Sequence, residues 1–257
     1  MKISIKYYFE ILLGKVLSSQ PNVRSYSRSN EIHTVQNRIA SVNVHHPTAL
    51  CKIMKQENSD KGIARHNYTT VYHALLSNMR QKQMVMFEMG IGTNNTSFAF
   101  NMGKNGTPGA SLRGWQRYFE NSRIFGADID EGALFEEDRI KTYFCDQLDA
   151  EAIADMWSKI SLQGNKEADI IIDDGLHTFE ANVCLFENSI GKLAKGGCYI
   201  VEDVTLVDLA KWEQKIQDDY IEKFPDLTFL AIEIPNRPLR DIQDNNVVVV
   251  FDAKRFA

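Results

Sequence analysis

Two carboxylates and an imidazole follow an apolar run at residues 170–177, which read IIIDDGLH. A short apolar run of this kind is typical of a buried strand. We expect Asp173 and Asp174 to end that strand, and Gly175 to form a tight turn that leaves His177 within reach of the same pocket. Carboxylates bind cations and a neutral imidazole accepts a proton, so the segment predicts metal or acid–base chemistry.

A second pair of carboxylates ends the next predicted strand, because residues 197–203 read GCYIVED. Parallel strands end at one edge of their sheet, which would bring Glu202 and Asp203 next to Asp174. Three crowded carboxylates repel one another without a cation, and their hard oxygens suit Mg²⁺ or a similar ion. We therefore expect Asp174, Glu202 and Asp203 to bind a divalent cation, with His177 as general base. Taken singly, His177 can also be a core or capping histidine and Asp203 an N-cap.

A glycine turn follows an earlier apolar run, in residues 87–95, FEMGIGTNN. Gly90 and Gly92 would bring the backbone close to a ligand, but Asn95 replaces the third glycine of a dinucleotide fingerprint. Glu88, before the turn, can accept a hydrogen bond from an amino group, directly or through water. The turn therefore favours S-adenosylmethionine, which has a ribose, an amino group and a sulfonium but no phosphate.

Acids also end the next two predicted strands, RIFGAD and TYFC. Asp128 can accept both hydroxyls of a ribose, and Asp146, with Gln147 beside it, can accept the amino group of adenine. A single such acid would be better explained as a helix N-cap. Acids at three successive strand ends predict a nucleoside pocket, to which we also assign Asp173.

Residues 101–119 insert a polar, glycine-rich loop before a helix restarts at SLRGW. Ser111 is the expected N-cap of that helix, and with Arg113 it is expected to reach the cofactor carboxylate. Tyr68, near the start of an earlier helix, is placed to overhang the cofactor. The alternatives are a surface loop and a core tyrosine.

Strands and helices alternate from residue 83 onward. Expected strands are residues 84–89, 123–128, 142–145, 169–173, 197–203, 227–234 and 246–252, and expected helices are 150–160, 180–193 and 206–224. The pattern predicts an α/β, Rossmann-like, doubly wound and mostly parallel sheet of seven strands with an antiparallel edge hairpin. Residues 1–80 lack a buried-strand pattern, so we expect a helical N-terminal extension at 1–80 and one domain at 81–257.

Composition narrows the classes of partner. A net charge of -5 opposes general binding to nucleic acid, which needs a basic face. The four cysteines lack metal-type spacing, which fits a reducing cytoplasm. The apolar stretch in residues 1–20 is interrupted by Glu10 and has no clear cleavage site, so we interpret it as an amphipathic helix without stable membrane insertion. A homo-oligomer is compatible with this pattern.

These motifs together resemble class I S-adenosylmethionine-dependent methyltransferases. The sequence is similar to the metal-dependent sugar O-methyltransferases of macrolide glycosides and of polysaccharide gene clusters, from about residue 60 to 251, with ASLRGW and DDGLH as the more specific motifs. The resemblance implies a Rossmann-like sheet, Mg²⁺ on Asp174, Glu202 and Asp203, and a base at His177. Leu176 and Ala181 replace a serine and a second histidine that many relatives carry, so the substrate pocket differs.

The sequence thus predicts an S-adenosylmethionine-dependent O-methyltransferase that acts on a sugar hydroxyl, in a nucleotide sugar or a surface-polysaccharide precursor. One alternative is a nicotinamide-dependent oxidoreductase on the same fold, which Asn95 opposes. A second alternative is a cofactor-binding module without catalysis. Retention of His177 and the three candidate ligands opposes that alternative.

Overall fold

The computed structural model describes residues 19–28, 33–98, 100–161, 163–164, 167–235, 245–252 and 256. Its elements are β1 (Asn22–Tyr26), α2 (His33–Ala40), α3 (Ala49–Gln56), α4 (Tyr68–Leu76), η1 (Ser77–Met79), β2 (Val85–Met89), α5 (Ala110–Tyr118), β3 (Arg123–Asp128), η2 (Glu131–Ala133), β4 (Glu136–Glu137), β5 (Ile140–Phe144), α6 (Ala150–Ser161), β6 (Ala168–Asp173), α7 (Phe179–Ser189), η3 (Ile190–Lys192), β7 (Leu193–Val204), α8 (Leu206–Lys215), the π-helical η4 (Ile216–Tyr220), α9 (Ile221–Lys223), β8 (Thr228–Glu233) and β9 (Asn246–Phe251).

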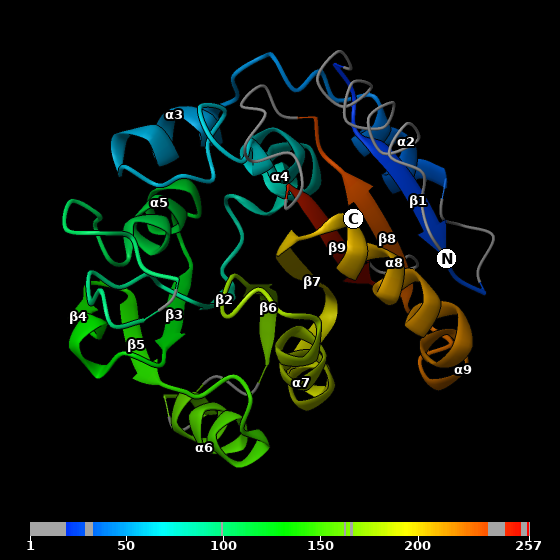
Figure 1. Cartoon of the computed structure of the whole chain (residues 1–257). Coiled ribbons are helices and arrows are strands. Elements are labelled where there is room, and N and C mark those ends of the chain that lie inside the picture. Colours follow the sequence, from blue (N-terminus) through cyan, green and yellow to red (C-terminus); the bar gives the residue numbers. More distant parts are fainter. Residues whose placement is uncertain are drawn as a thin grey trace.

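One mixed sheet organises the chain, in the order β1-β8-β9-β7-β6-β2-β3-β5-β4 (Figure 1). The central strands β5, β3, β2, β6 and β7 are parallel. Strand β9 pairs antiparallel with both β7 and β8, so the predicted antiparallel hairpin is present, but β1 pairs with β8 and forms the edge of the sheet instead. Strand order reverses between β2 and β6, and such a switch point is where doubly wound sheets bind ligands.

The predicted fold class is confirmed, but the count of seven strands is too low. All seven expected strands are present, and β1 and the two-residue β4 bring the sheet to nine. Strand β1 pairs with β8 at the sheet edge, so the segment 1–80 is not purely helical. Its sequence, NVRSY, is polar and has no alternating apolar face, which is usual for an edge strand and hides it from pattern analysis.

Two local predictions are also wrong. The expected helix 180–193 ends too late and the expected strand 197–203 begins too late, because α7 ends at Ser189 and β7 already begins at Leu193. Gly196 has φ +82°, and the pairing of β7 with β6 shifts register between Leu193 and Cys198, so Gly196 and Gly197 lie in a bulge inside the strand. Ser111 does not cap α5, whose N-cap is Gly109.

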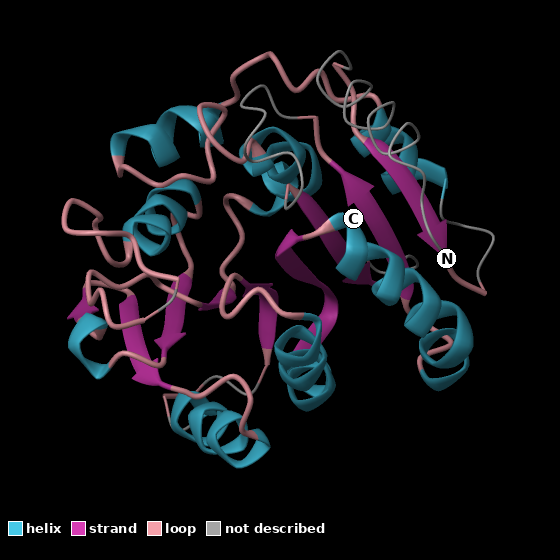
Figure 2. Cartoon of the chain, in the orientation of Figure 1, coloured by secondary structure: helices cyan, strands magenta, loops and turns pink. Residues whose placement is uncertain are grey.

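Helices cover both faces of the sheet (Figure 2). Helices α2 to α5 contribute to the hydrophobic cluster on one face, and α6, α7 and α8 to the cluster on the other. The predicted boundary at residue 80 stays a prediction, although residues on both sides of it share the first cluster. The amphipathic helix expected in residues 1–20 falls largely outside the described residues.

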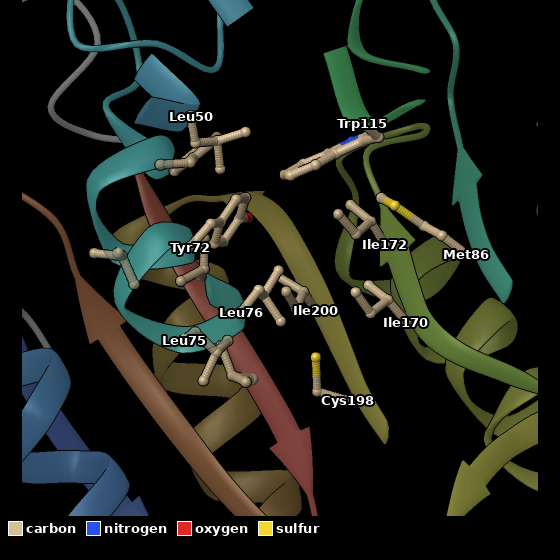
Figure 3. Packing of buried hydrophobic residues seen from close by; sticks show 14 of the residues in the cluster. Leu50, Tyr72, Leu75, Leu76, Met86, Trp115, Ile170, Ile172, Cys198 and Ile200 are labelled. Atoms are coloured by element: carbon tan, nitrogen blue, oxygen red, sulfur yellow. The ribbon is translucent and has the colours of Figure 1, made fainter. Parts of the chain in front are cut away.

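Helix α4 packs directly on the centre of the sheet. Figure 3 shows its side chains facing strands β6 and β7, in a buried group of Tyr72, Leu75, Leu76, Ile170, Ile172, Cys198 and Ile200. Large apolar side chains buried in this way contribute about 1.5–3 kcal/mol each. This packing fixes the N-terminal turn of α4, and the loop before it, against the ends of β6 and β7. Within the described ranges, no helix is both long and apolar enough to cross a membrane.

Candidate active site

A cavity of about 510 Å³ lies at the carboxyl edge of the parallel strands. It is lined by the turn after β2, the ends of β3, β5, β6 and β7, residues 98 and 100–102, and the segment 59–61. Predicted site residues that line it are Gly90, Gly92, Ser111, Asp128, Asp146, Gln147, Asp174, His177 and Asp203. Within the described residues, Tyr68, Glu88, Arg113, Asp173 and Glu202 do not contribute to the lining.

The glycine turn needs both of its glycines. Gly90 has φ +82°, and a Cβ there would lie 1.9 Å from the carbonyl oxygen of Asp174. Gly92 has φ +81°, and its Cβ would lie 2.3 Å from the sulfur of Met102. The turn therefore packs closely against the backbone that follows β6. This packing joins the part of the cavity beside β2 to the part beside β6.

Asp128 and Asp146 hold the loops that follow their strands. Asp128 accepts the backbone N–H groups of Ile91 and Asp130, each at 3.0 Å. Burial raises the pKa of Asp128, and these backbone hydrogen bonds oppose the rise. Asp146 accepts the N–H of Leu148 at 2.9 Å. Asp128 ends β3 and Asp146 lies two residues past the end of β5, and both line the cavity wall.

Glu88 lies beneath the glycine turn and is fully buried. Its carboxylate accepts the Ser111 hydroxyl and the indole N–H of Trp115, the latter at 2.6 Å. The ammonium of Lys61 lies 3.8 Å away. Glu88 therefore binds an amino group inside the protein, and Ser111 links α5 to β2.

Asp173 and Gln147 form a buried network behind the cavity. Gln147 donates to Asp173 at 2.7 Å and accepts the N–H of Leu176 at 2.8 Å. Asn182 donates to the other oxygen of Asp173 at 3.0 Å. A Cβ on Gly175 would lie 2.0 Å from the Gln147 oxygen, so a larger residue there would displace the Gln147 side chain.

Arg113 and Tyr68 have partners away from the predicted cofactor. Arg113 pairs with Glu137 at 2.6 Å and lies over the ring of Phe135. Tyr68, on α4, is buried and donates its hydroxyl to Asp203. Their roles toward a cofactor stay predictions.

Asp174, His177 and Asp203 converge at the other end of the cavity. Each offers a donor atom, and within the described residues these donors lie within 4.8 Å of one another. Nδ1 of His177 is 3.5 Å from one Asp203 oxygen, and Nδ1 of His66 is 3.2 Å from the other. Both Nδ1 atoms are buried, and neither makes a hydrogen bond within the described structure.

Glu202 faces a different set of partners. Lys61 donates to Glu202 and to Asp174, each at 2.5 Å, and Tyr72 donates to Glu202 at 2.8 Å. Lys61 and Glu202 are each 1 % exposed, so this ion pair is closed to solvent. The loop before α4 therefore supplies a cation to the carboxylates that the sequence assigned to a metal.

Burial and charge separate the pKa values of these acids. Burial raises the pKa of Asp174 to about 7, although Lys61 opposes the rise. Burial also raises the pKa of Glu202 well above its usual range. Burial would lower the pKa of Lys61, but Asp174, Glu202 and Glu88 outweigh it and raise that pKa, so the amine carries its charge.

Asp203 behaves in the opposite way. Burial alone would raise its pKa, but His177, His66 and the hydroxyl of Tyr68 favour the carboxylate and lower the pKa below the usual value. Asp203 is thus the acid in this group whose ionised form the surroundings stabilise.

Backbone strain coincides with this end of the cavity. His177 has φ 57° and Asp203 has φ 51°, in a region that non-glycine residues rarely adopt. Thr178 caps α7 and Thr205 caps α8, so each strained residue lies just before a helix begins. Such strain costs of order 1–3 kcal/mol and tends to persist at functional sites.

Sequence analysis did not identify Lys61, Tyr72 or Phe100 as site residues. Phe100 is 58 % exposed, and its ring meets His177 edge-on at 5.4 Å. One feature of the sequence could have pointed to Lys61: it belongs to the SDKG segment, which lies in the stretch that resembles the methyltransferases. Its role depends on contacts more than a hundred residues away, which a local pattern does not show.

Comparison with known proteins supports the resemblance seen in the sequence. No family model matches the chain. It is 30% identical over 171 residues to the 8-demethyl-8-alpha-L-rhamnosyl tetracenomycin-C 2'-O-methyltransferase of Streptomyces olivaceus, covering 66% of this chain and 41% of the relative. It is 30% identical over 139 residues to the demethylmacrocin O-methyltransferase of Streptomyces fradiae, covering 54% and 32%. The chain therefore spans about two fifths or less of the length of these curated relatives.

A solved structure shares the fold. The MycE methyltransferase from the mycinamycin biosynthetic pathway, in complex with Mg and SAH, superposes with a TM-score of 0.57 at 22% identity, covering 80% of this chain and 55% of that one. The predicted resemblance is confirmed: the chain is similar in sequence to sugar O-methyltransferases and has the Rossmann-like fold of a class I methyltransferase.

Proposed function

We propose that the chain is an S-adenosylmethionine-dependent O-methyltransferase that methylates a sugar hydroxyl with the help of a divalent cation. One observation carries the proposal: a single cavity joins the glycine turn and its strand-end acids to the group of Asp174, His177 and Asp203. The relatives similar in sequence are named for O-methylation of sugars.

The first half of the cavity suits the cofactor. Asp128 is in position to accept the ribose hydroxyls, and Asp146 to bind the adenine edge, because both line the wall beside the glycine turn. Gly90 and Gly92 let the turn pack closely against Asp174 and Met102, which shapes this wall of the cavity. Ser111 and Gln147 line this wall too, and each is hydrogen-bonded to a buried acid outside the lining, Glu88 and Asp173 respectively.

The second half fits a divalent cation. Asp174 and Asp203 offer carboxylate oxygens at the cavity wall, and the buried Nδ1 of His177 has no hydrogen-bond partner within the described residues. Mg²⁺ is commonly held by one or two carboxylates, with water and substrate oxygens as further ligands. The MycE structure similar to this fold contains Mg. A bound cation would lower the pKa of a substrate hydroxyl.

The residues of the chain then divide the chemical work. The methyl group moves from sulfur to the sugar oxygen, the C–S bond breaks as the C–O bond forms, and His177 takes the hydroxyl proton. The Asp203 carboxylate, 3.5 Å from Nδ1 of His177, would stabilise the resulting imidazolium. Holding both reactants in one cavity supplies much of the rate by orientation.

The described lining favours an uncharged sugar over a nucleotide sugar. Its acids are Asp60, Asp128, Asp146, Asp174 and Asp203, and its one lysine, Lys61, is paired internally. Where the bound cation does not neutralise them, these acids would repel a diphosphate. The exposed ring of Phe100 beside His177 offers an apolar surface to a sugar or its aglycone. A surface-polysaccharide precursor and a cytoplasmic location stay predictions.

The experiment is methyl transfer from labelled S-adenosylmethionine to a panel of neutral glycosides and nucleotide sugars, with Mg²⁺. Transfer to a sugar hydroxyl supports the proposal. Binding of NAD in calorimetry, without a response to S-adenosylhomocysteine, would contradict it and favour an oxidoreductase.

A further inference from the structure

Asp60 is the acid in the cavity lining that the proposed function leaves without a task. The acids that line the cavity are Asp60, Asp128, Asp146, Asp174 and Asp203. The proposed function assigns Asp128 and Asp146 to the nucleoside, and Asp174 and Asp203 to the cation. A polar group that faces a ligand cavity and serves neither of these ligands is a candidate for contact with the acceptor.

Backbone hydrogen bonds fix the place of Asp60 in the fold. The N–H of Ser59 donates to the carbonyl of Met54, in α3, at 2.9 Å. The N–H of Thr69, in α4, donates to the carbonyl of Lys61 at 3.2 Å. These bonds join main-chain atoms on both sides of Asp60, so they do not depend on what the cavity holds.

The side chain of Asp60 lies on the His177 side of the cavity. Its Oδ2 atom is 3.8 Å from Nε2 of His66. Nδ1 of the same ring is 3.2 Å from an oxygen of Asp203, and the other oxygen of Asp203 is 3.5 Å from Nδ1 of His177. Asp60 therefore belongs to the part of the cavity where the proposed acceptor lies.

The carboxylate of Asp60 is open to a ligand. Its side chain is 52 % exposed, and the separation of 3.8 Å from His66 exceeds hydrogen-bonding distance. Within the described residues, no group donates a hydrogen bond to this carboxylate. A carboxylate has only acceptor oxygens, so a ligand that binds it must bring an N–H or O–H group.

Apolar side chains share this side of the cavity with Asp60. Phe100 meets His177 edge-on at 5.4 Å, and Leu176 directly precedes His177; both line the cavity. Apolar surfaces of this kind pack against the ring carbons of a sugar but do not distinguish its hydroxyls. In such pockets a small number of polar groups fix the orientation of the ligand. Asp60 is in position to do so here.

We infer that Asp60 is a specificity-determining residue, whose carboxylate accepts a hydrogen bond from a second hydroxyl of the acceptor sugar and thereby selects the hydroxyl presented to His177. This inference rests on the proposed function, because it takes the acceptor to be a sugar. The acceptor is then a glycoside with two free hydroxyls, one that is methylated and one that binds Asp60. A sugar whose second hydroxyl is missing or already methylated is a poor substrate, because it has no hydrogen to donate.

The test is a double-mutant cycle between Asp60 and the acceptor. The value of kcat/KM would be measured for wild type and Asp60→Ala, with the best neutral glycoside of the panel and with analogues that each lack one hydroxyl. In wild type, loss of one hydroxyl other than the methylated one should lower kcat/KM by about 10–100-fold, as for a hydrogen bond to a charged group. In Asp60→Ala the parent glycoside should lose a similar factor, and removal of that hydroxyl should cost less than about 2-fold more.

Two control variants separate contact with the sugar from a structural role. Asp60→Asn keeps an acceptor oxygen but loses the charge, so kcat/KM should fall less, by about 3–10-fold. Asp155→Ala removes an exposed acid that pairs with Lys159 on α6 at 2.7 Å, and it should leave every value within about 2-fold of wild type.

The position of the new methyl group is a second readout, which a merely structural role would not change. Wild type should give one methyl ether of the glycoside, and Asp60→Ala a mixture of positional isomers, as seen by nuclear magnetic resonance of the products. A single, unchanged product from Asp60→Ala would count against the inference.

Equal losses for every analogue in wild type and in Asp60→Ala would overturn the inference, because no hydroxyl would then depend on Asp60. If the dissociation constant of S-adenosylhomocysteine also rises more than about 10-fold in Asp60→Ala, the residue serves the cofactor instead. If Asp60→Ala does not fold, Asp60→Asn carries the same cycle.

The inference and the proposed function fail separately. A wild type that methylates a sugar, with equal losses in both proteins, contradicts the inference alone. A wild type that binds S-adenosylhomocysteine but methylates no sugar of the panel contradicts the proposed function, and the inference with it.

Discussion

The two halves of the cavity are built in different ways. The cofactor half follows directly from the sheet: a glycine turn follows β2, Asp128 ends β3, and Asp146 lies just past β5. The cation half is assembled over long distances, because Lys61, His66, Tyr68 and Tyr72 come from the N-terminal segment to meet β6 and β7. We therefore expect the cofactor half to tolerate changes in the N-terminal segment, whereas the cation half depends on how α4 packs against the sheet.

This contrast shows why the N-terminal segment belongs to the site. Lys61 supplies positive charge, His66 and Tyr68 surround Asp203, and Tyr72 holds Glu202. The sheet edge alone would leave several carboxylates without a partner. The following variants separate the halves, from the largest expected effect to the smallest.

His177→Ala should lower the rate of methyl transfer by about 10²–10⁴-fold, the usual contribution of a general base. The affinity for S-adenosylhomocysteine should be almost unchanged, because the nucleoside wall lies on other strands. Single-turnover kinetics with a saturating sugar substrate measures the first effect and calorimetry the second. Near-normal turnover in this variant would make His177 structural and leave His66 as the next candidate.

Gly90→Ala should damage both halves at once. The new Cβ would meet the Asp174 carbonyl oxygen at 1.9 Å, and the backbone has φ +82°. The left-handed conformation alone costs an alanine roughly 1–2 kcal/mol, so we expect a loss of at least about 3 kcal/mol once the overlap is included. Gly103→Ala is the control, because Gly103 has φ +68° and a Cβ there would meet no atom within 4 Å. Equal losses in urea unfolding of the two variants would show that the close approach at Gly90 is unimportant.

Asp128→Ala should affect the cofactor half alone. Loss of charge-assisted hydrogen bonds to a ribose should weaken S-adenosylhomocysteine binding by about 1.5–3 kcal/mol. Mn²⁺ affinity should stay within about 3-fold of wild type, which corresponds to roughly 0.7 kcal/mol or less. Calorimetry on this variant and on Asp155→Ala, an exposed acid paired with Lys159 on α6, measures both affinities. A parallel loss of Mn²⁺ binding would mean that the two halves are not independent.

Arg113→Ala should have the smallest effect. Its guanidinium is held by Glu137 and lies over Phe135, so its removal should cost about 0–1 kcal/mol of stability. Cofactor affinity should change less than about 2-fold, or roughly 0.4 kcal/mol. A tenfold weaker S-adenosylhomocysteine complex would instead support the sequence-based expectation that Arg113 reaches the cofactor carboxylate.

The sequence predicts the cofactor half better than the cation half, because strand ends and glycine turns follow from local patterns of residues. Strand ends such as Asp128 and Asp174 follow from apolar runs, and the Gly90 turn follows from its glycines. The partner of Ser111 does not follow from its position, because α5 begins two residues earlier than a Ser111 cap would place it and the hydroxyl donates to Glu88 instead.

Contacts distant in sequence leave even less of a local signal. In the sequence Lys61 looks like an ordinary polar loop residue. Its partner Glu202 lies on β7, 141 positions further along the chain, so a local pattern does not reveal the contact. Edge strand β1 was missed for a related reason, since its polar sequence becomes a strand through pairing with β8.

Removal of the cation tests the central claim most directly, namely that one cavity joins an independent cofactor half to a cation-dependent half. Methyl transfer and S-adenosylhomocysteine affinity would be measured on the same protein, before and after exhaustive chelation and again after Mg²⁺ is restored. We predict that chelation abolishes transfer, that Mg²⁺ restores it, and that the S-adenosylhomocysteine dissociation constant stays within about 3-fold, or roughly 0.7 kcal/mol, throughout. Full methyl transfer after chelation would contradict the account.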